Sequence, residues 1–370
     1  MTQPYLGSRA HPSLLPHFLV ALYGLAIVYA SLQPFSPWIA PPPATPFFLF
    51  APWPPRWTRF DAIANIVAYA PFGFFVALVP RRRPPLGRLS VAIAAGAALS
   101  FALESLQMFV PPRDANAIDL IANTTGATLG GLAAIAFARS ASAKRGVMSV
   151  RERWFVGGRI GDLGLALLTI WLAVQVNPGI PLFAIMFDPA AEFGAAASTV
   201  PGSTDTDIAA ALVQGAHSAF QLLGVGLFLS LLLRERRSVG GAVLLLIGAA
   251  LLAKGVAALF LLKPAVWDHW LSPGVSTGVA AGALLLLGAI SLPRPAQVAV
   301  ATIALLLSLL TTLLAPDLLS ARPPLSMFSW SYGHLLHFNG LTHIVLLAWP
   351  LVASTYLFVL AGQPNWGRPS

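Results

Sequence analysis

Charged and amide side chains recur at helical spacing within one otherwise apolar stretch, residues 61–130. Three apolar segments there each carry a carboxylate and an amide three or four positions apart, and the pairs are Asp61 with Asn65, Glu104 with Gln107, and Asp119 with Asn123. Residues at this spacing lie on one face of a helix. Three helices are therefore predicted to present matching acidic and amide groups at a similar depth.

Groups of this kind support several kinds of chemistry. Carboxylate and amide oxygens suit a divalent cation such as Mg²⁺ or Ca²⁺, and no organic cofactor is predicted. A carboxylate beside a guanidinium can act as a general acid or base, and the guanidinium of Arg113 can hold a phosphate or a carboxylate. The candidate acid–base residues are Glu104, Asp119 and Asp61, and the candidate ligand-binding residues are Asn65, Gln107, Arg113, Asp114 and Asn123.

The same stretch also admits structural interpretations, which the sequence leaves open. Asp61 and Asp119 lie near predicted helix starts, where a carboxylate can cap the helix, and the amides can bridge helices. Glu104 lies inside a predicted span and is not explained as a cap, since an ionisable residue there is usually paired or functional. Four residues are predicted to shape the bundle: Gly126 and Gly130 by close helix packing, and Pro71 and Gly73 by a kink that widens it.

The composition identifies the elements that must position these groups. Of the 370 residues, 57% are hydrophobic and 9% are charged, whereas a soluble domain has about 25% charged residues. Apolar runs of about 20 residues, enough to cross a bilayer, recur along the chain. The sequence predicts an all-α polytopic membrane helical bundle with ten spans, near 14–32, 60–80, 88–110, 116–138, 160–178, 208–233, 241–262, 275–292, 296–315 and 341–361.

The basic residues predict how the chain is oriented. Sixteen of the 22 Lys and Arg residues fall on one side of the predicted spans and five on the other. Because cytoplasmic loops are enriched in Lys and Arg, both termini are predicted to be cytoplasmic. The carboxylates then lie near the outer face. The basic residues behind the net charge of +9 lie mostly in these loops. They are therefore expected to face membrane lipids, and nucleic acid is not a predicted partner.

A basic linker, residues 139–159, divides a four-span part, residues 1–138, from a six-span part, residues 160–370. In the six-span part Lys254 lies near mid-membrane, and Glu104 has a comparable depth in the four-span part. We therefore expect the two parts to dock with Glu104 and Lys254 within pairing reach. The alternative is that Lys254 snorkels or faces a watery cavity.

Residues 61–130 resemble the VanZ-like domain, a family named after a protein of glycopeptide-resistance clusters. The shared pattern is Asp61-x3-Asn65-x3-Tyr69-x-Pro71-x-Gly73, then Glu104-x2-Gln107, then Arg113, and then Asp119-x3-Asn123-x2-Gly126-x3-Gly130. The resemblance covers the first four spans, about residues 14–138. It departs at Asn116, where the family prefers an acidic residue. It implies an integral protein of the bacterial inner membrane and cell envelope and, for the namesake branch, reduced susceptibility to teicoplanin.

Three function classes remain open. The outward-facing site could bind an envelope lipid, a lipid-linked glycan or a glycopeptide-type ligand without turnover, with a link to glycopeptide resistance. It could instead catalyse a reaction on a lipid-linked or phospholipid headgroup, with Glu104 or Asp119 as acid or base and Arg113 on a phosphate. The third class is a transporter. The sequence has no Walker-type phosphate loop, no GxSxG motif and no cysteine, and it does not define the oligomeric state.

Overall fold

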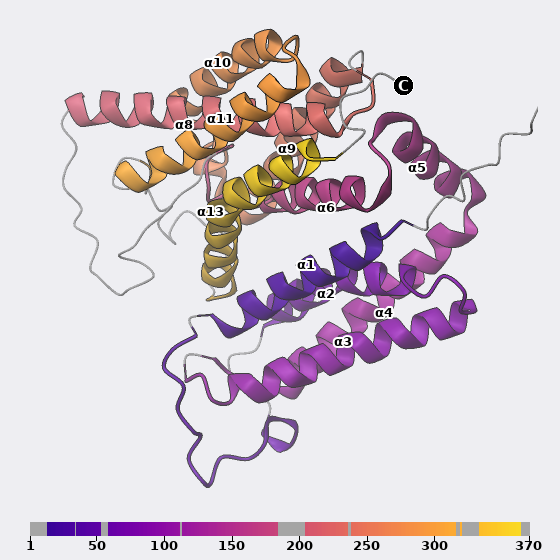
Figure 1. Cartoon of the computed structure of the whole chain (residues 1–370). Coiled ribbons are helices and arrows are strands. Elements are labelled where there is room, and N and C mark those ends of the chain that lie inside the picture. Colours follow the sequence, from indigo (N-terminus) through magenta and orange to yellow (C-terminus); the bar gives the residue numbers. More distant parts are fainter. Residues whose placement is uncertain are drawn as a thin grey trace, which may run out of the picture.

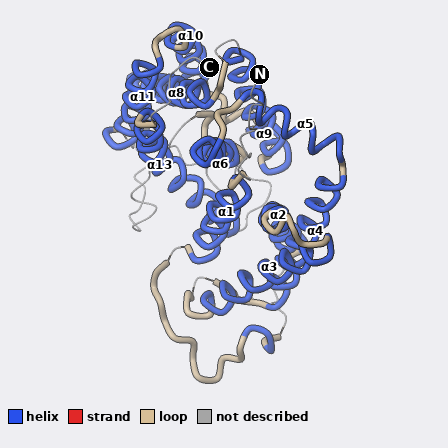
Figure 2. The backbone as a smooth tube through the Cα atoms, turned by 45° about the vertical axis from the view of Figure 1, so that its right-hand side comes forward, coloured by secondary structure: helices blue, strands red, loops and turns tan. Residues whose placement is uncertain are grey.

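The computed structural model describes residues 13–33, 35–52, 58–111, 113–183, 204–235, 238–315, 319 and 333–363, without the side chains of 204–207 and 333–340. This part contains 11 α-helices and two short 3₁₀ helices (Figure 1). Figure 2 shows no strand among the described residues, and the pairing of Phe155 with Leu233 is an isolated bridge. The predicted all-α fold is confirmed.

The first four long helices form one bundle, in the lower part of Figure 1. They are α1 (Leu15–Leu32), α2 (Arg59–Leu78), α3 (Pro85–Gln107) and α4 (Ala117–Arg139). Glycines of α4 face the backbone of α2. A Cβ added to Gly126 would lie 2.3 Å from the Ile66 oxygen, and one added to Gly130 would lie 1.9 Å from the Ala70 oxygen. A side chain has no room at either position, so these glycines allow the two backbones to touch.

α2 continues through Pro71 as one helix, and Gly73 draws the bundle together. A Cβ on Gly73 would lie 2.1 Å from the Ala127 oxygen of α4, and one on Gly96 of α3 would lie 2.3 Å from the Ala127 Cβ. The interpretation of Pro71 and Gly73 as a kink that widens the bundle is therefore wrong at Gly73. Three helices converge at this level because each contributes a small residue.

The remaining helices form a second, larger group in the upper part of Figure 1. They are α5 (Ala141–Trp154), α6 (Gly158–Val174), α8 (Thr204–Leu232), α9 (Val239–Leu261), α10 (Pro273–Ala289), α11 (Arg294–Leu314) and α13 (Gly333–Ala361). α8 lies at the centre, in contact with α10 and α11. Its Gly224 and Gly226 leave room for Leu305 of α11 and Leu286 of α10.

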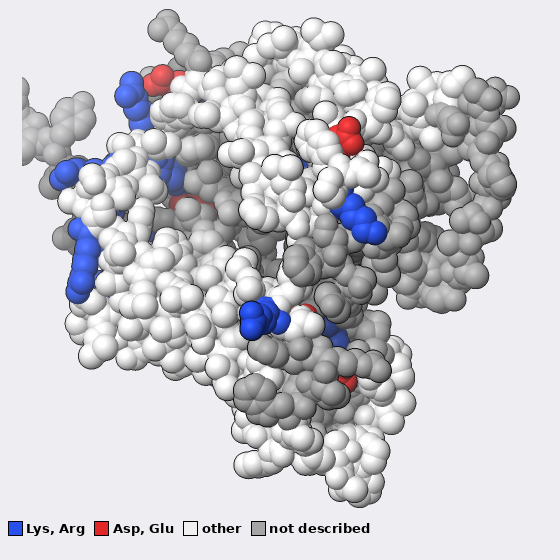
Figure 3. Space-filling view, turned by 180° about the vertical axis from the view of Figure 1, so that it is seen from behind, with Lys and Arg blue, Asp and Glu red and all other residues white. Residues whose placement is uncertain are grey.

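In the part of the chain that the structure describes, eight helices are long and apolar enough to cross a membrane, namely α1, α2, α3, α4, α8, α9, α11 and α13. The predicted spans 160–178 and 275–292 correspond to α6 and α10, which have 17 residues each. Such a helix is about 25 Å long, somewhat less than a hydrocarbon core of about 30 Å. Figure 3 shows a face with few charged side chains, separated by wide uncharged surface. The chain is a multi-pass membrane protein.

The two groups of helices meet through α1, which packs against α6 and α13. Asp162 of α6 is 2% exposed. Its carboxylate accepts a hydrogen bond from the Leu14 nitrogen at the start of α1 and pairs with Arg151 of α5, both at 2.8 Å. The backbone N–H groups at a helix start lack partners within the helix, so a carboxylate there is favourable. Asp162 therefore joins α1, α5 and α6.

Candidate functional site

The start of α2 uses Asp61 as a capping residue. The Thr58 nitrogen donates to the Asp61 carboxylate at 3.0 Å, and the Asp61 nitrogen donates to the Thr58 hydroxyl at 3.3 Å. This reciprocal arrangement is a capping box, which satisfies two backbone donors at the helix end. The hydrogen bonds of Asp61 thus support the helix cap that the sequence offers as its structural interpretation, and its role as an acid or base stays a prediction.

Asp119 lies at the centre of a hydrogen-bond network at the start of α4. Asn65 of α2 donates to its Oδ1 at 2.7 Å, and Asn116 donates to its Oδ2 at 2.9 Å. The Asp119 nitrogen in turn donates to the Asn116 side chain at 2.9 Å, so Asn116 is the N-cap of α4. Asn116, where the sequence pattern predicts an acidic residue, is thus a neutral residue that both caps the helix and orients a carboxylate.

Glu104 brings α3 into the same network. Its carboxylate accepts the backbone N–H of Asn116 at 2.9 Å, and the residue is 4% exposed. Asp119 and Arg113 are close enough to act on it electrostatically. Among the described residues, the ion pairs within 4.0 Å comprise Arg151 with Asp162 and none that involves Glu104. The buried carboxylate is therefore held by a neutral donor.

A second polar layer lies one helical turn deeper. Tyr69, Ser100 and Asn123 are each four positions from Asn65, Glu104 and Asp119, respectively, and all three are buried. The Asn123 amide donates to the Ser100 hydroxyl at 3.0 Å, and the Tyr69 hydroxyl lies near the same serine. The Asn123 oxygen has no hydrogen-bond partner among the described residues. Below this layer come Gly73, Gly96 and Ala127, so the polar layers form a wedge closed by small residues.

Gln107 and Arg113 attach this wedge to α1. The Gln107 side chain donates to the Ser31 oxygen at 2.8 Å, and Arg113 donates to the Gln33 oxygen at 2.9 Å and to the Ala30 oxygen. These oxygens lie at the end of α1, where carbonyls lack helical partners and a cation is favourable. Burial lowers the pKa of Arg113 to about 10, although Glu104 and Asp119 oppose this change.

The structure therefore divides the predicted site residues into three groups. Glu104, Asp119, Asn65 and Asn123 meet between α2, α3 and α4. Gln107 and Arg113 connect that cluster to α1, while Asp61 caps α2 and Asp114 is exposed. No group of three His, Cys, Asp or Glu side chains in the described part could hold a metal ion. Of the three carboxylates that the sequence suggested, two lie together, Glu104 and Asp119. With the neighbouring amides and hydroxyl they form a cluster that we call the acidic wedge: Asn65, Ser100, Glu104, Asp119 and Asn123.

The match to known proteins falls on the same helices. Residues 15–138 match the family model described as VanZ/LLP1. The N-terminal bundle is a VanZ-like domain. This match confirms the resemblance that the polar pattern suggested, and it ends one residue before the end of α4. No curated protein and no solved structure shows a significant match to the chain.

Sequence reasoning missed two contributors to the VanZ-like domain's wedge. Ser100 is a small hydroxyl residue in a mid-span position, and its place four residues before Glu104 is the signal that could have found it. The Asn116 N–H had no such signal, because a backbone donor has no side-chain pattern. Both contributors depend on how α3 and the α3–α4 joint fold back on each other.

The predicted pairing of Lys254 with Glu104 is wrong. Lys254 of α9 is 1% exposed, and its ammonium donates to the backbone oxygens of Asn177 at 2.7 Å and Ile180 at 2.8 Å. Two residues at the same depth in the membrane can still lie far apart in the plane of the membrane. The direction in which each side chain points, and the helix it meets, depend on packing.

Proposed function

We propose that the VanZ-like domain is a binding module of the cell envelope, and that the acidic wedge recognises a group that donates hydrogen bonds. Suitable ligands are the headgroup of an envelope lipid, a lipid-linked glycan or a glycopeptide-type molecule, all of which carry hydroxyl, amide or amine donors. The observation that carries the proposal is the position of Glu104, a buried carboxylate at the end of a membrane span with a backbone N–H as its described hydrogen-bond donor.

The charge balance supports this proposal. Glu104 and Asp119 lie within electrostatic reach of each other, and two carboxylates that share a site disfavour each other's charged form. Arg113, whose charge acts on Glu104, is held by the carbonyls at the end of α1. A ligand with an ammonium or several hydroxyl groups would relieve the repulsion between the carboxylates without displacing Arg113.

The second polar layer adds to the argument. The Asn123 oxygen is buried without a described partner, and leaving such an acceptor unsatisfied costs roughly 1–3 kcal/mol. It lies one turn below Asp119, so a ligand donor that extended to this depth would satisfy it. The wedge is thus organised in advance for more than one hydrogen bond.

We place the wedge on the outer face of the bacterial inner membrane. The loops on the opposite side of the predicted spans carry most of the basic residues, and such loops remain in the cytoplasm. In this orientation the wedge faces the compartment where envelope glycans are found and where glycopeptides act. A contribution to teicoplanin susceptibility is part of the proposal for the same reason.

The test is complementation in a host that lacks the gene, with Glu104→Gln compared with wild type. The substitution keeps the shape of the side chain and removes its charge, so we expect normal membrane levels by immunoblot and loss of the envelope phenotype, teicoplanin susceptibility included. The matched control is Asp61→Asn, because the amide oxygen can still cap α2, and this variant should complement. Full complementation by Glu104→Gln would contradict the proposal.

A specific observation also favours an enzyme as a second candidate. Two neighbouring carboxylates can divide the roles of general acid and general base between them. Purified protein in nanodiscs distinguishes the two functions, with a polyprenyl-diphosphate-linked disaccharide and teicoplanin as probes. Saturable binding with the probe recovered unchanged supports the binding module. Formation of a product that Glu104→Gln abolishes would show an enzyme.

A further inference from the structure

An open groove lies at the other end of the VanZ-like domain, between the start of α1 and the end of α2. Its volume is about 410 Å³. Eight residues line it: Ser13, Leu14, His17, Val79, Pro80, Arg81, Arg82 and Arg83. α1 is about 27 Å long at about 1.5 Å per residue, so the groove lies about one bilayer thickness away from the acidic wedge. It belongs to a different site.

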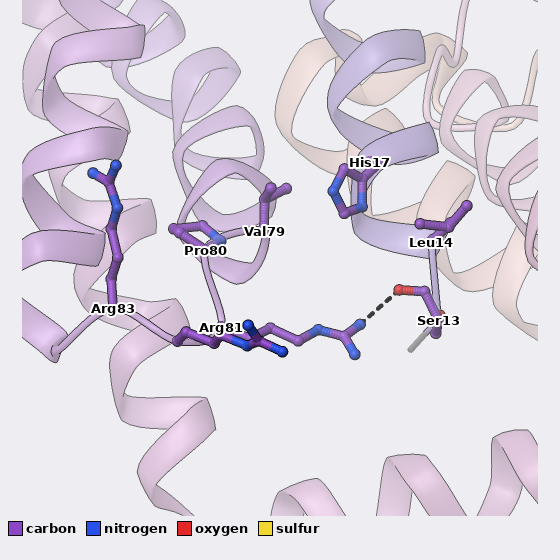
Figure 4. A pocket seen from close by; sticks show the side chains of 8 residues that line it. Ser13, Leu14, His17, Val79, Pro80, Arg81 and Arg83 are labelled. Atoms are coloured by element: carbon purple, nitrogen blue, oxygen red, sulfur yellow. Dashed lines mark hydrogen bonds between the residues drawn. The ribbon is translucent and has the colours of Figure 1, made fainter. Parts of the chain in front are cut away.

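The groove is basic on one side and apolar on the other. Figure 4 shows Arg81 extending from the end of α2 toward Ser13, with His17 facing the space between the two helices. Arg81 donates to the Ser13 backbone oxygen at 2.7 Å, which fixes the guanidinium across the groove. Leu14, Val79 and Pro80 supply the apolar wall. None of the described residues that line this groove is acidic.

The backbone at the start of α1 is already satisfied and is not the source of anion binding. The Leu14 nitrogen donates to Asp162, and the Leu15 nitrogen donates to the Ser13 hydroxyl. The positive charge of the groove therefore comes from side chains. An arginine guanidinium has five N–H donors in a planar fork that matches phosphate oxygens, and a single hydrogen bond from Arg81 to Ser13 leaves most of these donors available.

We propose that this groove binds the phosphate-bearing headgroup of an anionic membrane lipid. Arg81 and Arg82 would hold the phosphate, and Leu14, Val79 and Pro80 would contact the glycerol and the first methylenes of the acyl chains. The location supports a lipid over a soluble phosphate, because the groove joins the ends of two membrane-crossing helices, where headgroups lie. This inference does not depend on the function of the acidic wedge.

The experiment uses the full chain in nanodiscs of phosphatidylcholine with a minor share of phosphatidylglycerol. A photo-crosslinking p-benzoylphenylalanine at Val79 labels what occupies the groove, and mass spectrometry identifies the adducts. We expect phosphatidylglycerol adducts severalfold above the bulk share of that lipid. Adducts at bulk composition, or crosslinks to residues 1–12 of the same chain, would overturn the proposal.

Charge variants decide whether the groove itself provides the selectivity. Arg81→Gln with Arg82→Gln should bring the phosphatidylglycerol adducts down to the bulk share, and Arg81→Lys with Arg82→Lys should retain much of the enrichment. The matched control, Lys144→Gln with Arg145→Gln on α5, removes the same charge from the same predicted membrane side and should leave the enrichment intact. Equal loss in both Gln pairs would show general surface attraction. Loss of the adducts in millimolar inorganic phosphate would show a site for a free anion.

Discussion

The VanZ-like domain and the C-terminal group of helices each bury polar side chains, and the two sets differ in charge. The acidic wedge holds Glu104 and Asp119 at the ends of spans. The C-terminal cluster is built from a lysine, an imidazole, amides and hydroxyls, with Lys254, His217 and Gln221 at 1%, 0% and 2% exposure. The hydrogen-bond partners of the two sets differ as well.

In the C-terminal group, the polar side chains satisfy backbone that has left the helix. After α6 the chain is not helical from Asn177 to Phe183, although most of this segment is buried. Lys254 donates hydrogen bonds to two backbone carbonyls of this segment. The Asn177 side-chain oxygen accepts a hydrogen bond from the Gly179 nitrogen at 2.9 Å. Irregular backbone at membrane depth is tolerated where the protein supplies such partners. Lys254 therefore acts as a structural cation.

The other members of this cluster connect α8 to α11. His217 and Thr311 share a hydrogen bond of 2.8 Å, and the Gln221 amide donates to the Ser308 hydroxyl at 3.0 Å. Neutral hydrogen bonds of this kind hold membrane helices together. The acidic wedge also has neutral bridges, but it places two carboxylates among them. Contact between helices does not require those charges, which is why we propose a binding role for the wedge.

The largest expected effect is that of Lys254→Ala. The substitution leaves two buried carbonyls without their donor, and hydrogen bonds to charged groups contribute roughly 1.5–3 kcal/mol each, so we expect a loss of about 3 kcal/mol or more. Unfolding by SDS titration in mixed micelles, followed by tryptophan fluorescence, measures the change. The exposed Lys263→Ala is the matched control and should stay within about 0.5 kcal/mol of wild type. Equal stability of the two variants would show that Lys254 is not structural.

Gly130→Ala should have an intermediate effect. The new Cβ would lie 1.9 Å from the Ala70 oxygen, so α2 and α4 must separate, and overpacking of this kind costs about 1–3 kcal/mol. The separation also stretches the bond between Asn65 and Asp119, so ligand binding should weaken together with stability. Gly248→Ala in α9 serves as the control, because a Cβ there meets nothing within 4 Å. Unchanged stability in Gly130→Ala would contradict the close contact of α2 with α4.

The smallest effect is expected for Gln221→Leu. Interhelical hydrogen bonds in a membrane contribute about 0.6 kcal/mol on average, and the Gln221 oxygen is buried without a described partner, so its removal offsets part of the loss. We expect a change below about 0.6 kcal/mol in the same SDS titration. A loss of stability as large as that of Lys254→Ala would show that the polar side chains of the C-terminal cluster stabilise the protein as one unit. It would contradict the description of the Gln221 bond as an ordinary interhelical hydrogen bond.

The sequence by itself determined the helical class, the positions of most spans and the residues that could form a site. The spans are readable because each needs a continuous apolar run. The candidate site residues are readable because a charged residue such as Glu104 is unusual within such a run. The cap formed by Thr58 and Asp61 is also local, since its partners lie three positions apart, and the structural interpretation of Asp61 anticipated it. Spacing also predicted that Asn65 shares a helix face with Asp61 and Asn123 with Asp119, but each amide bonds a different helix: Asn65 donates to Asp119, and Asn123 donates to Ser100.

The tertiary structure decided which of these groups meet. Depth along a span does not give the neighbour that a side chain contacts, so depth predicts a pairing of Glu104 with Lys254, whereas Glu104 accepts a hydrogen bond from the Asn116 N–H. Likewise, Gly73 was expected to open the bundle, and it closes the bundle because Gly96 and Ala127 come to the same level. Contacts between helices depend on shape complementarity along their whole length, which no single stretch of sequence specifies.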